Sequence, residues 1–209
     1  VIPANPLLGD CRGHTSSRSL SYTSSSLTFL SHRLLLGMYM SHYLYRSFVY
    51  PLRMRGGKRM PAGICALAAI FCAYNGYLQG RLWSALTVVE LETPMATLRF
   101  ASGFSIWALG WGINMHSDAL LRHLRAPGES GYKIPRGGLF EWVSGANYLG
   151  EVVEWAGYAL ASWRLAPLAF ALFTLANTGP RAYQHHQWYL NKFKEEYPKH
   201  RRALIPFVW

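Results

Sequence analysis

The sequence has little charge, and the charge that it has is one-sided. Only 15% of the 209 residues are Asp, Glu, Lys or Arg, whereas soluble domains usually have about 25%. Acidic residues number 10 against 21 Lys and Arg, which gives a formal net charge of +11. Since 51% of the residues are hydrophobic, this mixture of apolar blocks and basic connectors is typical of a polytopic membrane protein.

Several motifs that would indicate other classes of protein are absent. The cysteines are odd in number, and Cys65 and Cys72 lie in one apolar run, which favours packed thiols over a disulfide framework or a zinc site. Residues 1–27 contain no apolar stretch of a secretory signal. No GxGxxG follows a strand, so a Rossmann site is not indicated. We find no internal repeat, which predicts a single domain.

The basic residues lie in short connectors between apolar runs, and no recognition fold with a continuous basic face is apparent. We therefore expect a lipid bilayer, not a nucleic acid, as the partner of this charge. The apolar runs approach the ~20 residues that cross a bilayer as a helix, and they lack the strict alternation of barrel strands. We predict an all-α fold, a polytopic membrane helix bundle with about five spans: 34–50, 62–80, 98–117, 141–163 and 165–180, the last ending at "TGP".

Basic and non-basic connectors alternate along the chain. Residues 51–61, 118–140 and the C-terminal tail are rich in Lys and Arg, whereas 82–97 contains Glu90 and Glu92 and no basic residue. Since basic connectors usually face the cytosol, we expect the C-terminus on the cytosolic side.

Polar residues recur at helical spacing inside or at the ends of the expected spans. Asn147, Glu151 and Glu154 stand at i, i+4 and i+7 and would share one helix face. Ionisable groups at membrane depth are costly and usually face a cavity or a partner. Three more sets of polar residues lie at the ends of expected spans. They are Asn114, Asp118, Arg122 and Arg125; Arg181, His185 and Tyr189; and His42, Tyr43, Arg46 and Tyr50.

Together these groups predict one polar cavity, open to the cytosol, suited to an anionic ligand with an aromatic ring such as a nucleotide. Simpler readings exist for single residues. Arg122 and Arg125 could extend to the membrane boundary, Tyr189 could belong to an interfacial aromatic belt, and Glu154 could be half of a structural ion pair. His185 is followed directly by another histidine, a spacing that does not make a zinc motif, so we expect no metal.

Four stretches carry a specific resemblance: "NGYLQG", "GINMHSDALLRHLR", "GYKIPRGGLFEWVSGANYLGEVVEWAGYALASW" and "EEYPKHRRALIPFVW". They closely resemble the steroid 5α-reductases, the 3-oxo-5α-steroid 4-dehydrogenases of the endoplasmic reticulum, and look most like the type 1 branch. The resemblance implies a seven-helix membrane enzyme that binds NADPH. Such an enzyme delivers hydride to C5 and a proton to C4 of a 3-oxo-Δ4-steroid such as testosterone or progesterone.

The resemblance also implies roles for individual residues. Tyr43 matches the tyrosine that hydrogen-bonds the steroid 3-ketone, and Glu151 matches an essential carboxylate near the nicotinamide. The positions that match the lining of the NADPH cavity are Asn114, Asp118, Arg125, Tyr132, Asn147, Arg181, His185 and Tyr189.

One part of the chain departs from the family. Residues 1–33 are Ser-rich and match nothing in it, so we treat them as a separate segment, disordered or aberrant, and 34–209 as the catalytic domain. The family's "QELPS"-type stretch, whose Glu partners the tyrosine at the ketone, is missing here. We therefore expect an N-terminally truncated form. The alternatives are a catalytically impaired isoform and a related membrane reductase of enoyl-CoA or polyprenol.

Overall fold

The computed structural model describes residues 14–54, 60–86, 91, 93–126, 129 and 131–209. The described residues are helical and contain no strand, so the predicted all-α class is confirmed. The α-helices are α1 (His14–Leu44), α2 (Tyr50–Arg53), α3 (Ala62–Arg81), α4 (Pro94–Arg122), α5 (Ala146–Ser162) and α6 (Leu165–Phe193). Shorter turns are the π-helical η1 (Tyr45–Val49) and η2 (Leu82–Leu86) and the 3₁₀ turns η3 (Gly138–Glu141) and η4 (Lys194–Glu196).

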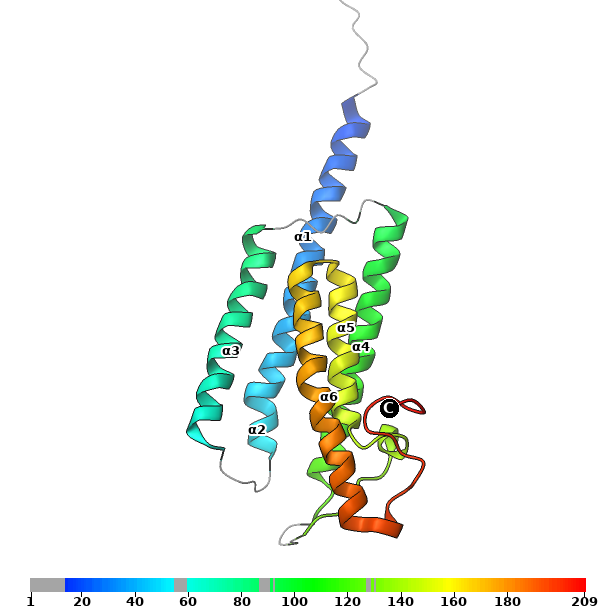
Figure 1. Ribbon diagram of the computed structural model, residues 1–209. Helices are drawn as coiled ribbons and strands as arrows, with labels where there is room; N and C mark the ends of the chain where they lie inside the picture. Colours follow the sequence, from blue (N-terminus) through cyan, green and yellow to red (C-terminus); the bar gives the residue numbers. More distant parts are fainter. Residues whose placement is uncertain (1–13, 55–59, 87–90, 92, 127–128, 130) are drawn as a thin grey trace, which may run out of the picture.

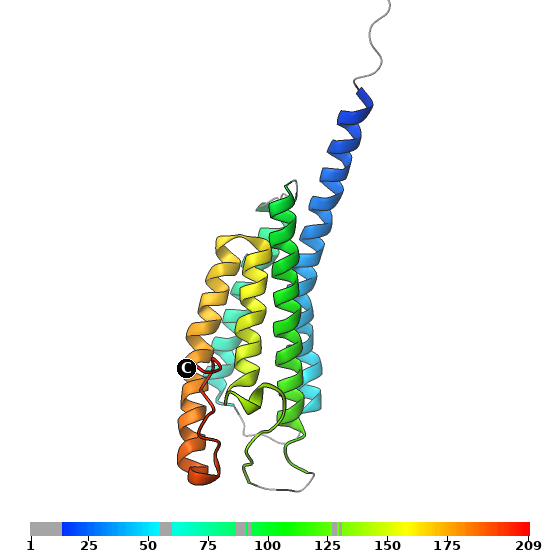
Figure 2. The same cartoon turned by 90° about the vertical axis from the view of Figure 1, so that its right-hand side faces the viewer.

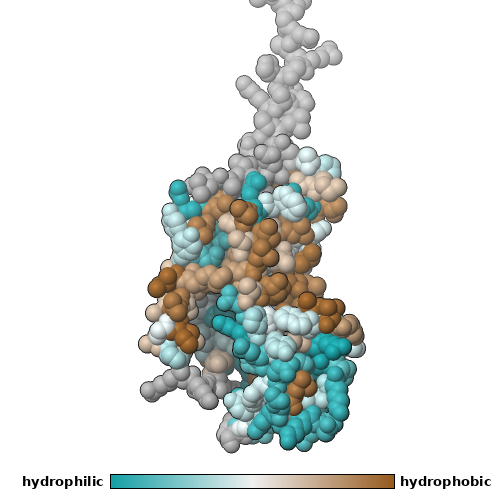
Figure 3. Space-filling view, viewed as in Figure 1, coloured by the Kyte–Doolittle hydropathy of each residue, from teal (hydrophilic) through white to brown (hydrophobic). Residues whose placement is uncertain are grey.

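The long helices run side by side as a bundle, and α1 projects beyond the others at its N-terminal end (Figure 1). Helix α5 packs against both α4 and α6, and α3 stands at the edge. The view turned by 90° shows the chain after α6 returning beside the lower ends of α5 and α6 (Figure 2). Hydrophilic residues gather at this lower end, whereas apolar residues cover much of the upper face (Figure 3).

Each of the five expected spans contains a helix, but the predicted start of the fourth span at residue 141 is wrong, because α5 begins at Ala146. The number of helices that cross a bilayer stays a prediction. Among the described residues, Ala62–Ser84 is long and apolar enough to cross a membrane, with a mean hydropathy of 1.3. The charged residues of the connectors used to predict orientation lie partly outside the described residues: Arg55, Lys58, Arg59, Glu90 and Glu92. Helix α1 begins at His14, inside the segment 1–33 that we expected to be irregular, and the domain boundary at residue 33 stays a prediction.

The prediction that the last span ends at "TGP" is wrong, because α6 continues through Pro180 to Phe193. Proline has no N–H to donate to the preceding turn, and this usually breaks a helix. Here the hydroxyls of the preceding turns supply extra hydrogen bonds to the backbone: Thr178 Oγ1 donates to the Thr174 carbonyl at 2.8 Å, and Thr174 Oγ1 to the Phe170 carbonyl at 3.0 Å. Neither bond reaches the Ala176 carbonyl that Pro180 leaves without its helical donor, so they support the preceding turns and do not replace the lost bond.

Helix α3 is built the opposite way from a helix of a soluble protein. Its buried side chains are two amides, Asn75 and Gln79, whereas apolar side chains such as Leu67 (70% exposed) and Ile70 (66%) point outward. In water, apolar area that stays exposed forgoes the stabilisation of about 25 cal/mol per Å² that burial would give. Contact with lipid would take this area out of water, so the exposure pattern of α3 favours lipid contact.

Helices α4 and α5 approach each other closely along four glycines, which we call the glycine seam: Gly103, Gly110, Gly150 and Gly157. A Cβ atom added to Gly110 would lie 2.2 Å from the backbone nitrogen of Glu154, and one added to Gly150 would lie 2.5 Å from that of Asn114. Small residues at membrane helix interfaces permit such backbone contact. The seam therefore brings the polar residues of α4 and α5 together.

A Gly110→Ala substitution should separate α4 from α5, because the added methyl group meets main-chain atoms that cannot rotate away. Overpacking of this kind typically costs roughly 1–3 kcal/mol, and we expect a lower midpoint of thermal unfolding in lipid nanodiscs. Gly112→Ala is the matched control, since nothing lies within 4 Å of its added Cβ. Equal melting of the two variants would contradict the seam.

Candidate functional site

A carboxylate–guanidinium pair with a buried carboxylate and a partly exposed guanidinium joins η1 to α4 near the lower end of the bundle. Arg46 Nη1 donates to Asp118 Oδ2 at 2.8 Å, and Asp118 is 1% exposed. Its second oxygen, Oδ1, is buried without a hydrogen-bond partner among the described residues. Glu151 of α5 lies close enough to interact electrostatically with both groups. Side chains from η1, α4 and α5 are therefore near one another here, and the cavity that the polar stripes predicted stays a prediction.

Asn114 lies one turn before Asp118 on α4, and its side chain is used between helices. Its Nδ2 donates to the main-chain carbonyl of Asn147, in the first turn of α5, at 2.9 Å. This bond follows from the close contact at Gly150. The structure thus brings Asn114 and Asn147 together, and their ligand-binding role stays a prediction.

Arg125 does not continue the stripe of α4, because that helix ends at Arg122. This part of the sequence prediction is wrong: the helical spacing holds from 114 to 122 only. The Arg125 guanidinium instead lies 5.8 Å from the centre of the Tyr132 ring. Tyr132 contacts Trp188 of α6 at 4.7 Å between centroids, and Trp188 in turn neighbours Tyr189 at 5.2 Å. The structure thereby brings Arg125, Tyr132 and Tyr189 into one aromatic group.

The expected residues of α6 face the start of α5. His185 Nε2 and the Tyr148 hydroxyl are 3.4 Å apart, and Arg181 acts electrostatically on the same tyrosine. Arg46 and Glu151 also interact electrostatically with Tyr148. Tyr148 therefore lies between the α6 residues and the Arg46–Asp118 pair. Sequence reasoning did not single out Tyr148, although it lies beside Asn147 in the motif.

Tyr43 lies apart from these charged groups, in the aromatic core of the bundle. Its ring contacts Tyr39 at 4.7 Å, His42 at 5.3 Å and Trp155 at 6.2 Å between centroids. It precedes Arg46 by less than one helical turn. Tyr43, the residue expected to bind the ketone, thus lies in the last turn of α1, and Arg46 lies in η1, which continues that helix.

The predicted structural role of Glu154 is confirmed, and its partner is His42. The two side chains are buried, and His42 Nδ1 lies 2.8 Å from Glu154 Oε1. Nothing in the sequence pairs them, because they are 112 positions apart. The His42 ring also contacts Trp155 at 4.8 Å between centroids, which places the pair next to the aromatic core.

The C-terminal segment closes the lower end of α5 through groups that sequence reasoning also missed. Ser144 and Gly145 donate their N–H groups to the carbonyls of Arg202 and Ala203 at 2.8 and 3.0 Å. Buried Arg201 donates to the Pro135 carbonyl at 2.8 Å and reaches Glu141 at 3.4 Å.

The N–H of Gly137 donates to Glu141 Oε1, and the Arg201 guanidinium donates to Glu141 Oε2. The Ser144 hydroxyl contacts both His186 Nδ1 and the Tyr197 hydroxyl at 2.6 Å. These contacts join the loop before α5 to the lower part of α6 and the segment that follows it.

Replacing His42 by Ala should destabilise the protein strongly, because Glu154 would be left buried without its partner. Breaking a buried pair typically costs about 3–5 kcal/mol, which thermal unfolding in nanodiscs would detect. Adding Glu154→Leu to that variant should recover much of the loss. His123→Ala is the control, as this exposed histidine bonds only its own helix. A double variant no more stable than His42→Ala would argue against the pair.

A family model described as 3-oxo-5-alpha-steroid 4-dehydrogenase matches residues 58–209. The chain is 53% identical over 176 residues to 3-oxo-5-alpha-steroid 4-dehydrogenase 1 of Macaca fascicularis, covering 84% of this chain and 66% of that relative.

The Bos taurus protein of the same name is 55% identical over 175 residues, covering 84% and 67%. 3-oxo-5-alpha-steroid 4-dehydrogenase 2 of Homo sapiens is 51% identical over 176 residues, covering 84% and 68%. The chain thus spans about two thirds of the length of these relatives. It belongs to the 3-oxo-5α-steroid 4-dehydrogenase family, the steroid 5α-reductases that its motifs resemble.

Proposed function

We propose that this protein reduces the 4,5 double bond of 3-oxo-Δ4-steroids with NADPH and forms 5α-reduced steroids. The names of the relatives, 3-oxo-5-alpha-steroid 4-dehydrogenases 1 and 2, support this reaction. The structural observation that carries the proposal is the Arg46–Asp118 ion pair, which lies near Glu151 and whose arginine follows Tyr43 by three residues in one continuous helical stretch. A charged site thus adjoins an aromatic site on one helix, as a nucleotide beside a steroid would require.

The residues present fit a nicotinamide nucleotide. A buried acceptor without a donor costs roughly 1–3 kcal/mol, so Asp118 Oδ1 is suited to an amide or hydroxyl group of a ligand. Arg125 and Arg181 are exposed, and among the described residues neither has a carboxylate within ion-pair distance. Guanidinium groups bind phosphates by paired hydrogen bonds. Asn147, His185 and the rings of Tyr132 and Tyr189 complete the set that would hold the cofactor.

When bound, NADPH would supply the hydride that adds to C5 of the steroid. The role of the protein's own residues is to hold the substrate and to stabilise the negative charge that develops on it. As the 3-ketone oxygen becomes negative, the Tyr43 hydroxyl donates a hydrogen bond to it, and a preorganised donor of this kind lowers the barrier. Glu151, near the Arg46–Asp118 pair, would accept a hydrogen bond from the ligand. The aromatic cluster around Trp155 keeps water from the apolar steroid rings.

We further propose a multi-pass location in the endoplasmic reticulum membrane with the C-terminus in the cytosol. The outward apolar face of α3 supports a position in lipid. The polar lower end, which contains the C-terminal segment, would then face the cytosol, where NADPH is available (Figure 3). The basic connectors favour the same orientation.

Membranes that contain the protein should convert a labelled 4-ene-3-oxo steroid to its 5α-reduced product when NADPH is added. Tyr43→Phe should lower kcat/KM by about 10²–10³-fold, because it removes one donor to the developing oxyanion. Tyr77→Phe is the control, since this phenol of α3 is 64% exposed. Product formation by Tyr43→Phe at the rate of the control would refute the assigned donor.

Asp118→Asn and Arg125→Ala should each weaken NADPH binding. Loss of one hydrogen bond to a charged group costs about 1.5–3 kcal/mol, which corresponds to roughly 10- to 150-fold in Kd. Fluorescence titration would measure the Kd for NADPH. Arg136→Ala is the control for Arg125→Ala. Affinities equal to that of the unchanged protein in both variants would remove these residues from the cofactor site.

A further inference from the structure

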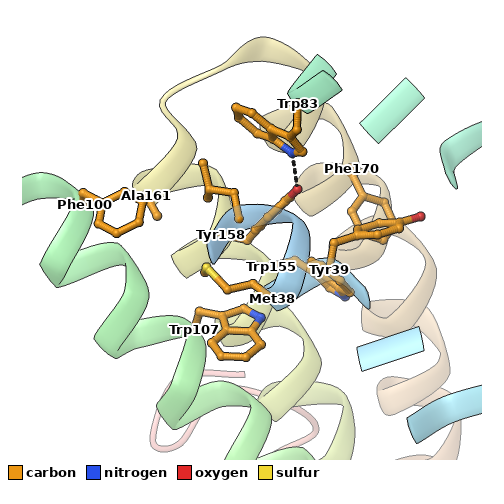
Figure 4. Close-up of a cluster of buried hydrophobic side chains, with 10 residues drawn as sticks. Met38, Tyr39, Trp83, Phe100, Trp107, Trp155, Tyr158, Ala161 and Phe170 are labelled. Carbon is orange, nitrogen blue, oxygen red and sulfur yellow. Dashed lines mark hydrogen bonds between the residues drawn. The ribbon is translucent and has the colours of Figure 1, made fainter. Parts of the chain in front are cut away.

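A chain of buried polar side chains crosses the bundle from η2 to α1. Trp83 Nε1 donates to the Tyr158 hydroxyl at 2.7 Å, and that hydroxyl donates to Gln79 Oε1 at 3.4 Å. Gln79 Nε2 donates to Asn75 Oδ1 at 3.5 Å, and Asn75 Nδ2 donates to the Tyr39 hydroxyl at 3.2 Å. All five residues are buried. Figure 4 shows the Trp83–Tyr158 bond and the position of Tyr39 in the same cluster.

Packing alone does not account for these amides. Asn75 and Gln79 are the buried side chains of α3, a helix whose apolar residues point outward. An apolar residue could fill either position without desolvating an amide. A buried amide that lacks a hydrogen-bond partner costs roughly 1–3 kcal/mol. The two amides instead connect tyrosines on two other helices, Tyr158 of α5 and Tyr39 of α1.

The chain of bonds has one direction, because it starts at a group that can only donate. An indole N–H has no acceptor, so the Tyr158 oxygen must accept from Trp83. The single hydroxyl hydrogen of Tyr158 is then available for Gln79, as observed. The amides pass the same polarity onward, with nitrogen toward Asn75 and then toward Tyr39. Tyr39 therefore accepts at its oxygen and keeps its own hydrogen for a further acceptor.

Tyr43 follows Tyr39 by one turn of α1, and the two rings lie 4.7 Å apart between centroids. We take the Tyr43 hydroxyl as the further acceptor because it is the next hydroxyl along this helix. If Tyr39 donates to the Tyr43 oxygen, the hydrogen of Tyr43 is left to point at a group outside the chain. Successive hydrogen bonds also polarise one another and strengthen the last donor.

We propose that Trp83, Tyr158, Gln79, Asn75 and Tyr39 are positioning residues that form a one-way hydrogen-bond chain and hold the Tyr43 hydroxyl as a donor to the substrate carbonyl. The inference deepens the proposed function and rests on its assignment of Tyr43 to the ketone. None of the five residues needs to touch the steroid. Their effect is on the orientation and strength of one donor.

The C3 carbonyl stretch of a bound 4-ene-3-oxo steroid tests this directly. The steroid is labelled with ¹³C at C3 and bound to the protein in nanodiscs with NADP⁺, and the band is recorded by infrared difference spectroscopy. Tyr158→Phe interrupts the chain but keeps the ring, and it should move the band part of the way toward that of the Tyr43→Phe complex. It should also lower kcat roughly 3- to 10-fold with little change in KM. Tyr77→Phe should leave both unchanged.

A wild-type band and kcat in Tyr158→Phe, with both altered in Tyr43→Phe, would overturn the chain and leave the proposed function intact. An unaltered band in Tyr43→Phe would instead overturn the ketone donor. If Tyr158→Phe does not fold, Tyr39→Phe interrupts the other end and is judged by the same criteria.

A second measurement needs no ligand. Tyr39→Phe and Trp83→Phe, at the two ends of the chain, should shift the unfolding temperature non-additively if the bonds form one network. Strictly additive shifts would contradict the proposal whatever the activity.

Discussion

The contact of α4 with α5 along the glycine seam determines where the other functional groups lie. Because Gly110 and Gly150 have no side chain, the two backbones touch, and the Asn114 amide reaches the main chain of α5. The same contact fixes the rotation of α5, so that Glu154 points to His42 of α1. Helix α1 is thereby positioned with Arg46 opposite Asp118. The charged site and the aromatic site thus both depend on the absence of methyl groups at one interface.

The helices are joined by polar contacts and aromatic packing, while much of the apolar surface faces outward. His42 and Glu154 form a buried polar contact between α1 and α5, and the Asn114 amide forms a part-buried one between α4 and α5. In lipid the hydrophobic effect does not drive helices together, and small residues with interhelical hydrogen bonds take that part. Polar residues here therefore provide cohesion as well as chemistry. This double use explains why the candidate site is continuous with the core.

The sequence predicted the existence of the long helices well, since each expected span contains one, although α5 begins five residues after the predicted start at 141. It failed at their ends: α6 passes Pro180, and α4 stops before Arg125, because hydropathy reports membrane depth and not the end of a hydrogen-bonded turn. Helical spacing correctly put Asp118 and Glu151 in a polar group. It could not name Arg46 or His42 as partners, because contacts across more than seventy residues depend on how helices rotate against each other.

The inverted polarity of α3 has a consequence for extracting the protein from membranes. Asn75 and Gln79 hold this helix to its neighbours by hydrogen bonds that are worth most where water is excluded. A short-chain detergent that admits water around α3 offers both amides competing partners. We expect α3 to detach first under such conditions, before the α4–α5 contact opens. Long-chain detergents or retained lipid should therefore keep α3 attached to the bundle better than short-chain detergents do, even where the short-chain detergents solubilise the protein more efficiently.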